Sequence, residues 1–197
     1  MNLKRIFDSL IQRKPKLVYD MASNHYMNKD AILKYLQDLN DELKIKDVKG
    51  ELCMVGGAVM CICFMSRIST LDVDAIFEPK TLIYECAEIV ARKNSLPKDW
   101  LNDGVKGFLS TKKDFFSYKE MSNLHVYVAS PEYMLAMKCL SARLENANEL
   151  DDIKFLLKHL KVSSFEEVIS MITKYYPVDR FKVKIQYALQ EILQDYE

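Results

Sequence analysis

Two aspartates, Asp72 and Asp74, stand one residue apart in an apolar stretch and are the strongest candidates for chemistry in this chain. The surrounding residues 69–77 are β-prone and alternate in character, which predicts a strand. Side chains on a strand alternate between its faces, so both carboxylates would project the same way while Val73 and Ala75 face the core. Two like charges on one face repel each other unless a cation lies between them. The pair therefore predicts a site for Mg²⁺, a hard cation that prefers oxygen ligands.

Groups suited to phosphate lie shortly before the aspartates. Gly56 and Gly57 follow a short apolar run, and a turn without Cβ atoms lets backbone N–H groups approach phosphate oxygens. Arg67 adds a planar fork of donors that matches phosphate. Three nearby hydroxyls are further donors: Ser66, Ser69 and Thr70. Together with the aspartates, these residues predict a site for a metal-bound nucleoside triphosphate, in which metal ions activate an attacking hydroxyl and stabilise the pyrophosphate leaving group.

Lys138 is the only charged residue between Tyr133 and Ala142, a stretch with a helical pattern. Rotation of the helix alone cannot keep this lysine on a solvated face. An isolated buried charge is costly, so Lys138 is expected to have an anionic partner.

The elements that must position these residues follow from the hydrophobic pattern. Helical spacing predicts helices over 28–45, 81–96, 130–145, 148–160, 164–176 and 181–196. Short β-prone runs predict strands over 51–55, 69–77 and 123–130. The run 58–67 is apolar throughout and fits a buried helix better than a second strand, and 97–103 is expected to be a loop or short turn.

Strands alternate with helices early in the chain, and helices dominate late. This order predicts an α/β (α+β) fold with a helical C-terminal part. We expect a core with N-terminal helices over residues 1–129, and a helical part over 130–197 that completes the site.

Composition excludes several classes of function. Lysine plus arginine and aspartate plus glutamate each number 28 among 197 residues, so a formal charge of zero gives no case for non-specific attraction to nucleic acid or membrane. The N-terminus carries charges every few residues, unlike a signal peptide, and no stretch is apolar enough to span a membrane. Five cysteines in apolar contexts predict free thiols in a reducing compartment: Cys53, Cys61, Cys63, Cys86 and Cys139. We expect a soluble cytoplasmic protein.

The glycines and aspartates resemble the hG[GS]…Dh[DE]h signature of the nucleotidyltransferase (polymerase β-like) superfamily, here Gly56-Gly57 and Asp72-Val73-Asp74. Fourteen residues separate the second glycine from the first aspartate, slightly more than is usual. The stretches 67–77, 96–103 and 130–157 are also similar to a bacterial branch of the superfamily, related to the AbiEii and MenT toxins of toxin–antitoxin systems. The resemblance covers roughly residues 50–160.

The resemblance implies a nucleotidyltransferase fold with a small mixed sheet flanked by helices. It implies Mg²⁺, with Mn²⁺ as an alternative, held by Asp72 and Asp74, and an NTP as substrate. A tRNA or protein acceptor and an antitoxin encoded by a neighbouring gene are the implied partners.

The toxin relatives also carry a pattern of the type K…R…D-x-x-D, which matches Lys138, Arg143 and Asp152. The resemblance implies that Lys138 and Arg143 bind the triphosphate and that Asp152 positions the metal or the lysine. A purely structural Lys138–Asp152 ion pair is the alternative. Glu149 stands where the relatives usually have aspartate, and Asp151 is a nearby alternative.

Two further features stay open at this point. Many superfamily members take a third metal-binding carboxylate from a following strand, whereas 123–130 offers only His125, so either the later helix supplies the acid or two ligands suffice. The stretch around Trp100, Asn102 and Asp103 matches the family, yet it fits equally well a residue group that caps and packs a loop. The three histidines show no ligand spacing: His25, His125 and His159.

The sequence therefore favours an enzyme that transfers a nucleoside monophosphate from a Mg-bound NTP to a hydroxyl on RNA, protein or a small molecule. The alternative is a catalytically inactive module that binds a nucleotide or a partner on the same fold.

Overall fold

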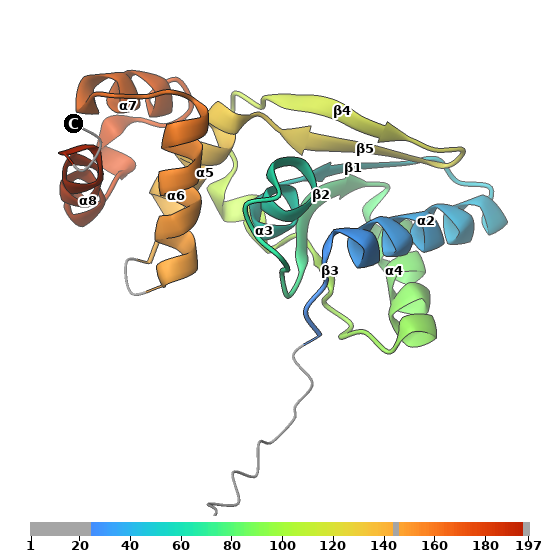
Figure 1. Ribbon diagram of the computed structural model, residues 1–197. Helices are drawn as coiled ribbons and strands as arrows, with labels where there is room; N and C mark the ends of the chain where they lie inside the picture. Colours follow the sequence, from blue (N-terminus) through green and yellow to red (C-terminus); the bar gives the residue numbers. More distant parts are fainter. Residues whose placement is uncertain (1–24, 144–145, 195–197) are drawn as a thin grey trace, which may run out of the picture.

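The structure, a computed structural model, describes residues 25–143 and 146–194 (Figure 1). Its five strands form one open mixed sheet in the order β3-β2-β1-β5-β4. Their bounds are β1 Gly50–Met54, β2 Val73–Glu78, β3 Leu101–Asn102, β4 Phe115–Glu120 and β5 Leu124–Ala129. The pairs β1–β5 and β2–β3 are parallel, and β1–β2 and β4–β5 are antiparallel. The predicted α+β class is confirmed.

Helices α2 (Lys29–Ile45) and α4 (Lys80–Asn94) pack side by side under the sheet (Figure 1). Helix α2 begins at Asn28, whose side chain accepts a hydrogen bond from the Ala31 N–H and so satisfies one free helix-end donor. Its apolar residues recur at helical spacing and are buried: Ile32, Leu36, Leu39 and Leu43. Both helices were predicted from this periodicity. The helices expected before residue 25 lie outside the described residues.

The chain turns sharply after β1. Gly56 has a φ of +69°, a left-handed conformation that favours glycine, and it opens α3 (Gly56–Val59). The helix continues as a π-helical segment, η1 (Met60–Phe64), and ends at Met65 with a φ of 53°. The apolar run 58–67 is thus helical, as predicted, although its second half is wound as a π-helix. The chain then returns towards β2.

Strand β2 shows the predicted alternation. Val73, Ala75 and Phe77 are buried, whereas Asp74 and Ile76 are half-buried on the opposite face. The strand begins at Val73 rather than at residue 69, because residues 66–72 form a loop. Thr70 in this loop exchanges two backbone hydrogen bonds with Met27, and this bridge ties the loop to the start of the described chain.

Helices dominate the C-terminal part and gather at one end of the sheet (Figure 1). Their bounds are α5 Pro131–Ser141, α6 Ala147–His159, α7 Phe165–Ile172 and α8 Val183–Gln194, with short 3₁₀ turns η2 (Gly104–Phe108) and η3 (Val178–Arg180). Helix α5 begins as predicted, with Ser130 as the cap and Pro131 in the first turn. It ends four residues earlier than predicted, because Ala142 is extended.

The topology places the predicted site residues at one edge of the sheet. Strands β1 and β5 are parallel, so the turn at Gly56 and the start of α5 both lie at their carboxyl ends. Strand β2 is antiparallel to β1, so its first residues lie at the same edge. Within the described residues, no helix is long and apolar enough to cross a membrane.

Candidate active site

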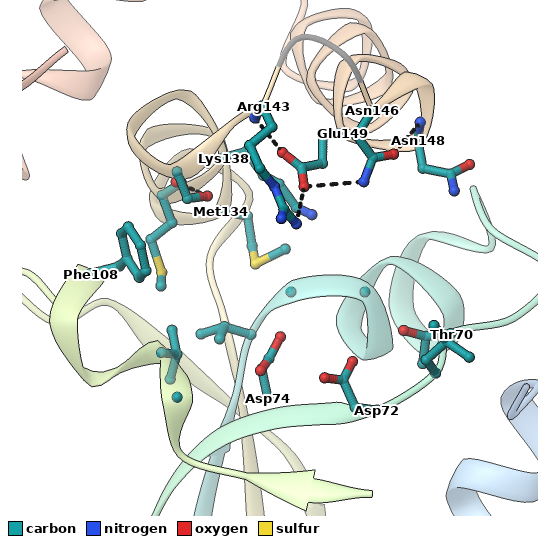
Figure 2. Close-up of a pocket in the computed structure, with 18 of the residues that line it drawn as sticks. Thr70, Asp72, Asp74, Phe108, Met134, Lys138, Arg143, Asn146, Asn148 and Glu149 are labelled. Carbon is teal, nitrogen blue, oxygen red and sulfur yellow. Dashed lines mark hydrogen bonds and ion pairs between the residues drawn. The ribbon is translucent and has the colours of Figure 1, made fainter. Parts of the chain in front are cut away.

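A cleft of about 890 Å³ opens at this edge, between the sheet and the C-terminal helices (Figure 2). It lies within the size range of small-molecule sites, roughly 300–1,000 Å³. Ten of the residues discussed from the sequence line it: Gly56, Gly57, Arg67, Ser69, Thr70, Asp72, Asp74, Lys138, Arg143 and Glu149. Two do not line it: Ser66 and Asp152. The structure thus brings residues from four distant stretches of the chain to one cleft.

The two aspartates stand together on the cleft side of β2 (Figure 2). The pKa of Asp74 is raised to about 6. Burial is the main cause, and the neighbouring charge of Asp72 adds to it. Burial also raises the pKa of Asp72. Both effects disfavour the ionised form, so a cation held between the carboxylates would relieve them.

Asn102 is the side chain that ties the aspartates to the next strand. Its Nδ2 donates to Asp72 Oδ2 at 3.2 Å, and its Oδ1 accepts from the Gly104 N–H at 2.9 Å. The same amide lowers the pKa of both carboxylates in part. Trp100, by contrast, is fully buried and donates from Nε1 to the Ala87 carbonyl at 3.0 Å. The family-like stretch therefore divides, with Asn102 at the carboxylates and Trp100 in the core.

Lys138 has the anionic partner that its sequence context predicts. Its Nζ lies 2.6 Å from Asp152 Oδ2, and the Asp152 side chain is only 1% exposed. Arg67 binds the same carboxylate through two bonds, from Nε at 2.7 Å and from Nη2 at 2.6 Å. Nη2 also donates to the Asn148 carbonyl at 2.9 Å. One buried carboxylate thus holds two cations at the cleft wall.

This arrangement sharpens the sequence interpretation of Asp152. The ion pair with Lys138 is present, yet both cations still line the cleft, with 13% and 20% of their side chains exposed. Asp152 therefore acts on Lys138 and Arg67 rather than on the cleft itself. Asp151, the alternative acid, is exposed and does not line the cleft.

Arg143 and Glu149 form the rim of the cleft. The backbone N–H of Arg143 donates to Glu149 Oε2 at 2.6 Å, and its guanidinium lies 3.2 Å from Oε1. Asn146 donates to the same Oε1 at 3.2 Å. Figure 2 shows these three side chains joined in one cluster across the cleft from Asp72 and Asp74. Glu149 thus fixes the place of Arg143.

The two glycines owe their identity to close packing. A Cβ on Gly56 would lie 2.9 Å from Asp74 Oδ2, and φ there is positive. A Cβ on Gly57 would collide with Thr70 Oγ1. Glycine at these positions lets the turn lie directly against the aspartate and the threonine. The sequence predicted glycine here so that phosphate could come close to the backbone. In the structure, the side chains of Asp74 and Thr70 already lie close to these two glycines.

The chain has no significant match among protein-family models, curated proteins or solved structures. The site must be interpreted from its own geometry.

A metal ion in this cleft would have Asp72 and Asp74 as its candidate carboxylate ligands. Among the described residues, no group of three or more histidine, cysteine, aspartate or glutamate side chains is placed to hold a metal. Asp152 is already bound by two cations, and the Nε2 of His125 on β5 lies 2.8 Å from Ser117 Oγ. The two destabilised carboxylates fit a hard divalent cation that takes its remaining ligands from substrate oxygens and water.

Ser66 is one of the two predicted site residues that do not line the cleft. The hydroxyl of Ser66 donates to the Met60 carbonyl at 3.4 Å, at the end of the π-helical segment. The same carbonyl also accepts the backbone N–H groups of Met65 and Ser66, so the serine belongs to the local closure of this helical segment.

Sequence reasoning missed several cleft residues, among them two basic and two aromatic side chains. Arg180 and Lys182 reach the cleft from the turn before α8, and Tyr26 and Phe108 add exposed aromatic rings. The two basic residues lie far from every motif, so their sequence carried no signal. Phe108 follows the Asn102 patch by only six residues, and the neighbouring Gly104 and Gly107 were its one hint of a turn.

Proposed function

We propose that this chain is a nucleotidyltransferase, which transfers a nucleoside monophosphate from a metal-bound NTP to a hydroxyl group. The observation that carries the proposal is one cleft with two sets of charge. Asp72 and Asp74 form no ion pair with a described residue, and Lys138 and Arg67 share the buried carboxylate of Asp152. The polymerase β-like superfamily resembled by the sequence combines the same residue types, and the five-stranded mixed sheet is compatible with its fold.

In this proposal Asp72 and Asp74 would hold Mg²⁺, which would supply Lewis-acid activation of the attacking hydroxyl and neutralise charge on the leaving pyrophosphate. Lys138 and Arg67 donate to the β- and γ-phosphate oxygens, and Ser69 and Thr70 are further donors on the same wall. A new bond forms between the acceptor oxygen and the α-phosphorus, the acceptor hydroxyl gives up its proton to solvent water, and the bond from the α-phosphorus to the pyrophosphate oxygen breaks. Asn102 keeps Asp72 in place throughout.

Asp152 is a positioning residue in this proposal. Because it is buried and bound by both cations, it fixes their ammonium and guanidinium groups before substrate arrives. Because the two cations are already held in position, little rearrangement of the protein is needed when phosphate binds.

The alternative is a module that binds nucleotide without transferring it. The pair of metal-binding carboxylates, in place of the three that many superfamily members have, is the observation that favours it. The similarity to toxin relatives adds the proposal that an antitoxin from a neighbouring gene blocks the cleft, with tRNA or a protein as acceptor.

Titration calorimetry with each NTP, with and without Mg²⁺, tests the proposal. We expect Mg²⁺-dependent binding that Asp72→Asn and Asp74→Asn each weaken by more than about a hundredfold, because they remove direct metal ligands. Asp151→Asn, which changes an exposed acid on α6, is the matched control and should bind normally.

Transfer of label from α-³²P NTP to cellular RNA or protein then separates the enzyme from the binding module. Binding without transfer would favour the module. Equal nucleotide affinity in the wild type and both aspartate variants would overturn the whole site assignment.

A further inference from the structure

The cleft has two chemically different ends. One end is polar and is formed by Thr70, Arg143, Asn146, Asn148 and Glu149. The other, which we call the apolar end, holds Phe108 and Val105 of η2, and Met134 and Met137 come from the contacting helix α5 (Figure 2). In Figure 2 the aspartates lie between Phe108 on one side and Thr70 on the other. A ligand that spans the cleft therefore meets the carboxylates in its middle.

Phe108 is the unusual residue of the apolar end. Its side chain is 40% exposed, whereas the three other apolar residues beside it are at most 8% exposed. An aromatic ring left in water forfeits about 25 cal/mol for each Å² of apolar surface that stays unburied. Aromatic rings at the wall of a polar cleft are typical of ligand sites.

The backbone of Phe108 is held in place. Its carbonyl accepts a hydrogen bond from the buried Tyr176 hydroxyl, and the first residue of the same 3₁₀ turn, Gly104, is bound by Asn102. Since Asn102 also binds Asp72, one side chain links the carboxylates to the turn that carries the ring. The distance between the carboxylates and Phe108 is thus fixed by the fold.

We propose that the apolar end binds the base of the nucleoside triphosphate, with the ring of Phe108 stacked on the base and the side chains of Met134 and Met137 against its edge. This inference rests on the proposed function, because the position of the base is deduced from where the triphosphate of a bound NTP would lie. Arg67 reaches Asn148 at the polar end, so the β- and γ-phosphates lie on that side of the carboxylates. The nucleoside, attached to the α-phosphate, then extends the other way.

Calorimetry with two ligands, Mg-NTP and Mg-tripolyphosphate, separates the two ends of the cleft. Tripolyphosphate carries the charge but has no base. Phe108→Ala should weaken NTP binding by about 5- to 150-fold, the equivalent of 1–3 kcal/mol for a stacked base, and leave tripolyphosphate binding unchanged. Phe108→Trp should retain or improve NTP binding.

Phe116→Ala is the matched control. Phe116 is 56% exposed on β4 and does not line the cleft, so its loss should affect neither ligand. Thermal melts of each variant show whether it is folded.

The outcomes distinguish this inference from the proposed function. If the wild type binds tripolyphosphate as tightly as NTP, or if Phe108→Ala leaves NTP affinity unchanged, the base lies elsewhere and this inference alone is overturned. A Phe108→Ala protein that binds NTP normally but loses affinity for its acceptor would assign the ring to the acceptor and also overturn it. If the wild type binds neither ligand, the proposed function itself fails.

Discussion

Asp74 and Asp103 lie close together at neighbouring strand ends, yet their surroundings are opposite. Asn102, the residue before Asp103, is the cross-strand partner of Asp74. Lys106 and Lys80 bind the Asp103 carboxylate and hold its pKa well below its usual range. Burial and Asp72 raise the pKa of Asp74 to about 6. The fold therefore supplies cations to Asp103, whereas Asp74 forms no ion pair with any described residue.

Asp152 is a third carboxylate to compare with Asp74 and Asp103, and it lies in the protein interior. It is 2% exposed, and its two cations come from different elements, Arg67 from the loop before β2 and Lys138 from α5. Like Asp103, it is a carboxylate with cations of its own. Unlike those of Asp103, its cations line the cleft and remain available to phosphate.

The largest expected effect comes from removing both cations of Asp152. Arg67→Met with Lys138→Met leaves a buried carboxylate without a partner, which should lower the free energy of unfolding by about 3–5 kcal/mol. Each single change should cost much less, because the other cation still binds Asp152. Denaturant unfolding measures all three proteins.

Two further proteins complete this test. Adding Asp152→Leu to the double variant should restore most of the lost stability, because the unpaired charge is gone. Arg143→Met, which removes an arginine with 75% side-chain exposure, is the control and should change stability little. Single costs that simply add up to the double cost would show that the two cations do not share one carboxylate.

Removing the charge of Asp74 and removing that of Asp103 should change the stability of the folded protein in opposite directions. Without Mg²⁺, Asp74→Asn should stabilise the folded protein at pH 7 by about 1–2 kcal/mol, allowing for partial screening by solvent. Asp103→Asn should lower the Tm, because it weakens bonds to Lys80, Lys106 and Tyr84. Thermal melts in a chelating buffer compare the two variants.

The raised pKa of Asp74 also predicts how the stability of the folded protein depends on pH. The folded-state pKa of Asp74, about 6, lies above its usual 3.8, so the folded protein binds the proton more tightly. The stability contribution of Asp74 is therefore largest below pH 4 and is lost as the pH rises through about 6. The advantage of Asp74→Asn should appear over the same window. A constant advantage from pH 4 to pH 7 would contradict the assignment.

The last prediction concerns Gly57. Gly57→Ala places a methyl group against Thr70 Oγ1 and should destabilise the protein by about 1–3 kcal/mol at most. Thr70→Ala in the same chain should recover much of this loss, which chemical denaturation can measure. An apo protein unaffected by Gly57→Ala would mean that the glycine is needed only for the ligand.

Local patterns made part of this site predictable. The alternation along β2, the glycine turn after β1 and the isolated charge of Lys138 each depend on residues close in sequence, and each is found as expected. The partners of these residues were harder to predict. Arg67 and Asp152 are 85 positions apart, and no periodic pattern connects a loop to a distant helix.

Two elements were missed for related reasons. Strand β4 lies at the sheet edge, and a register shift between Ser117 and Lys119 breaks the alternation by which a strand is recognised. Strand β3 has only two residues, and its role depends on pairing with β2 rather than on its own composition. The significance of Asn102 follows from that pairing.

The shared carboxylate also makes the C-terminal helices sensitive to what the cleft contains. Helix α6 carries Asp152, and its bonds to Arg67 and Lys138 connect it to the loop before β2 and to α5. A ligand that orders those two cations would slow the local opening of α6, even though Asp152 does not line the cleft. Amide hydrogen exchange around Asp152 in α6 would then report whether the cleft is occupied.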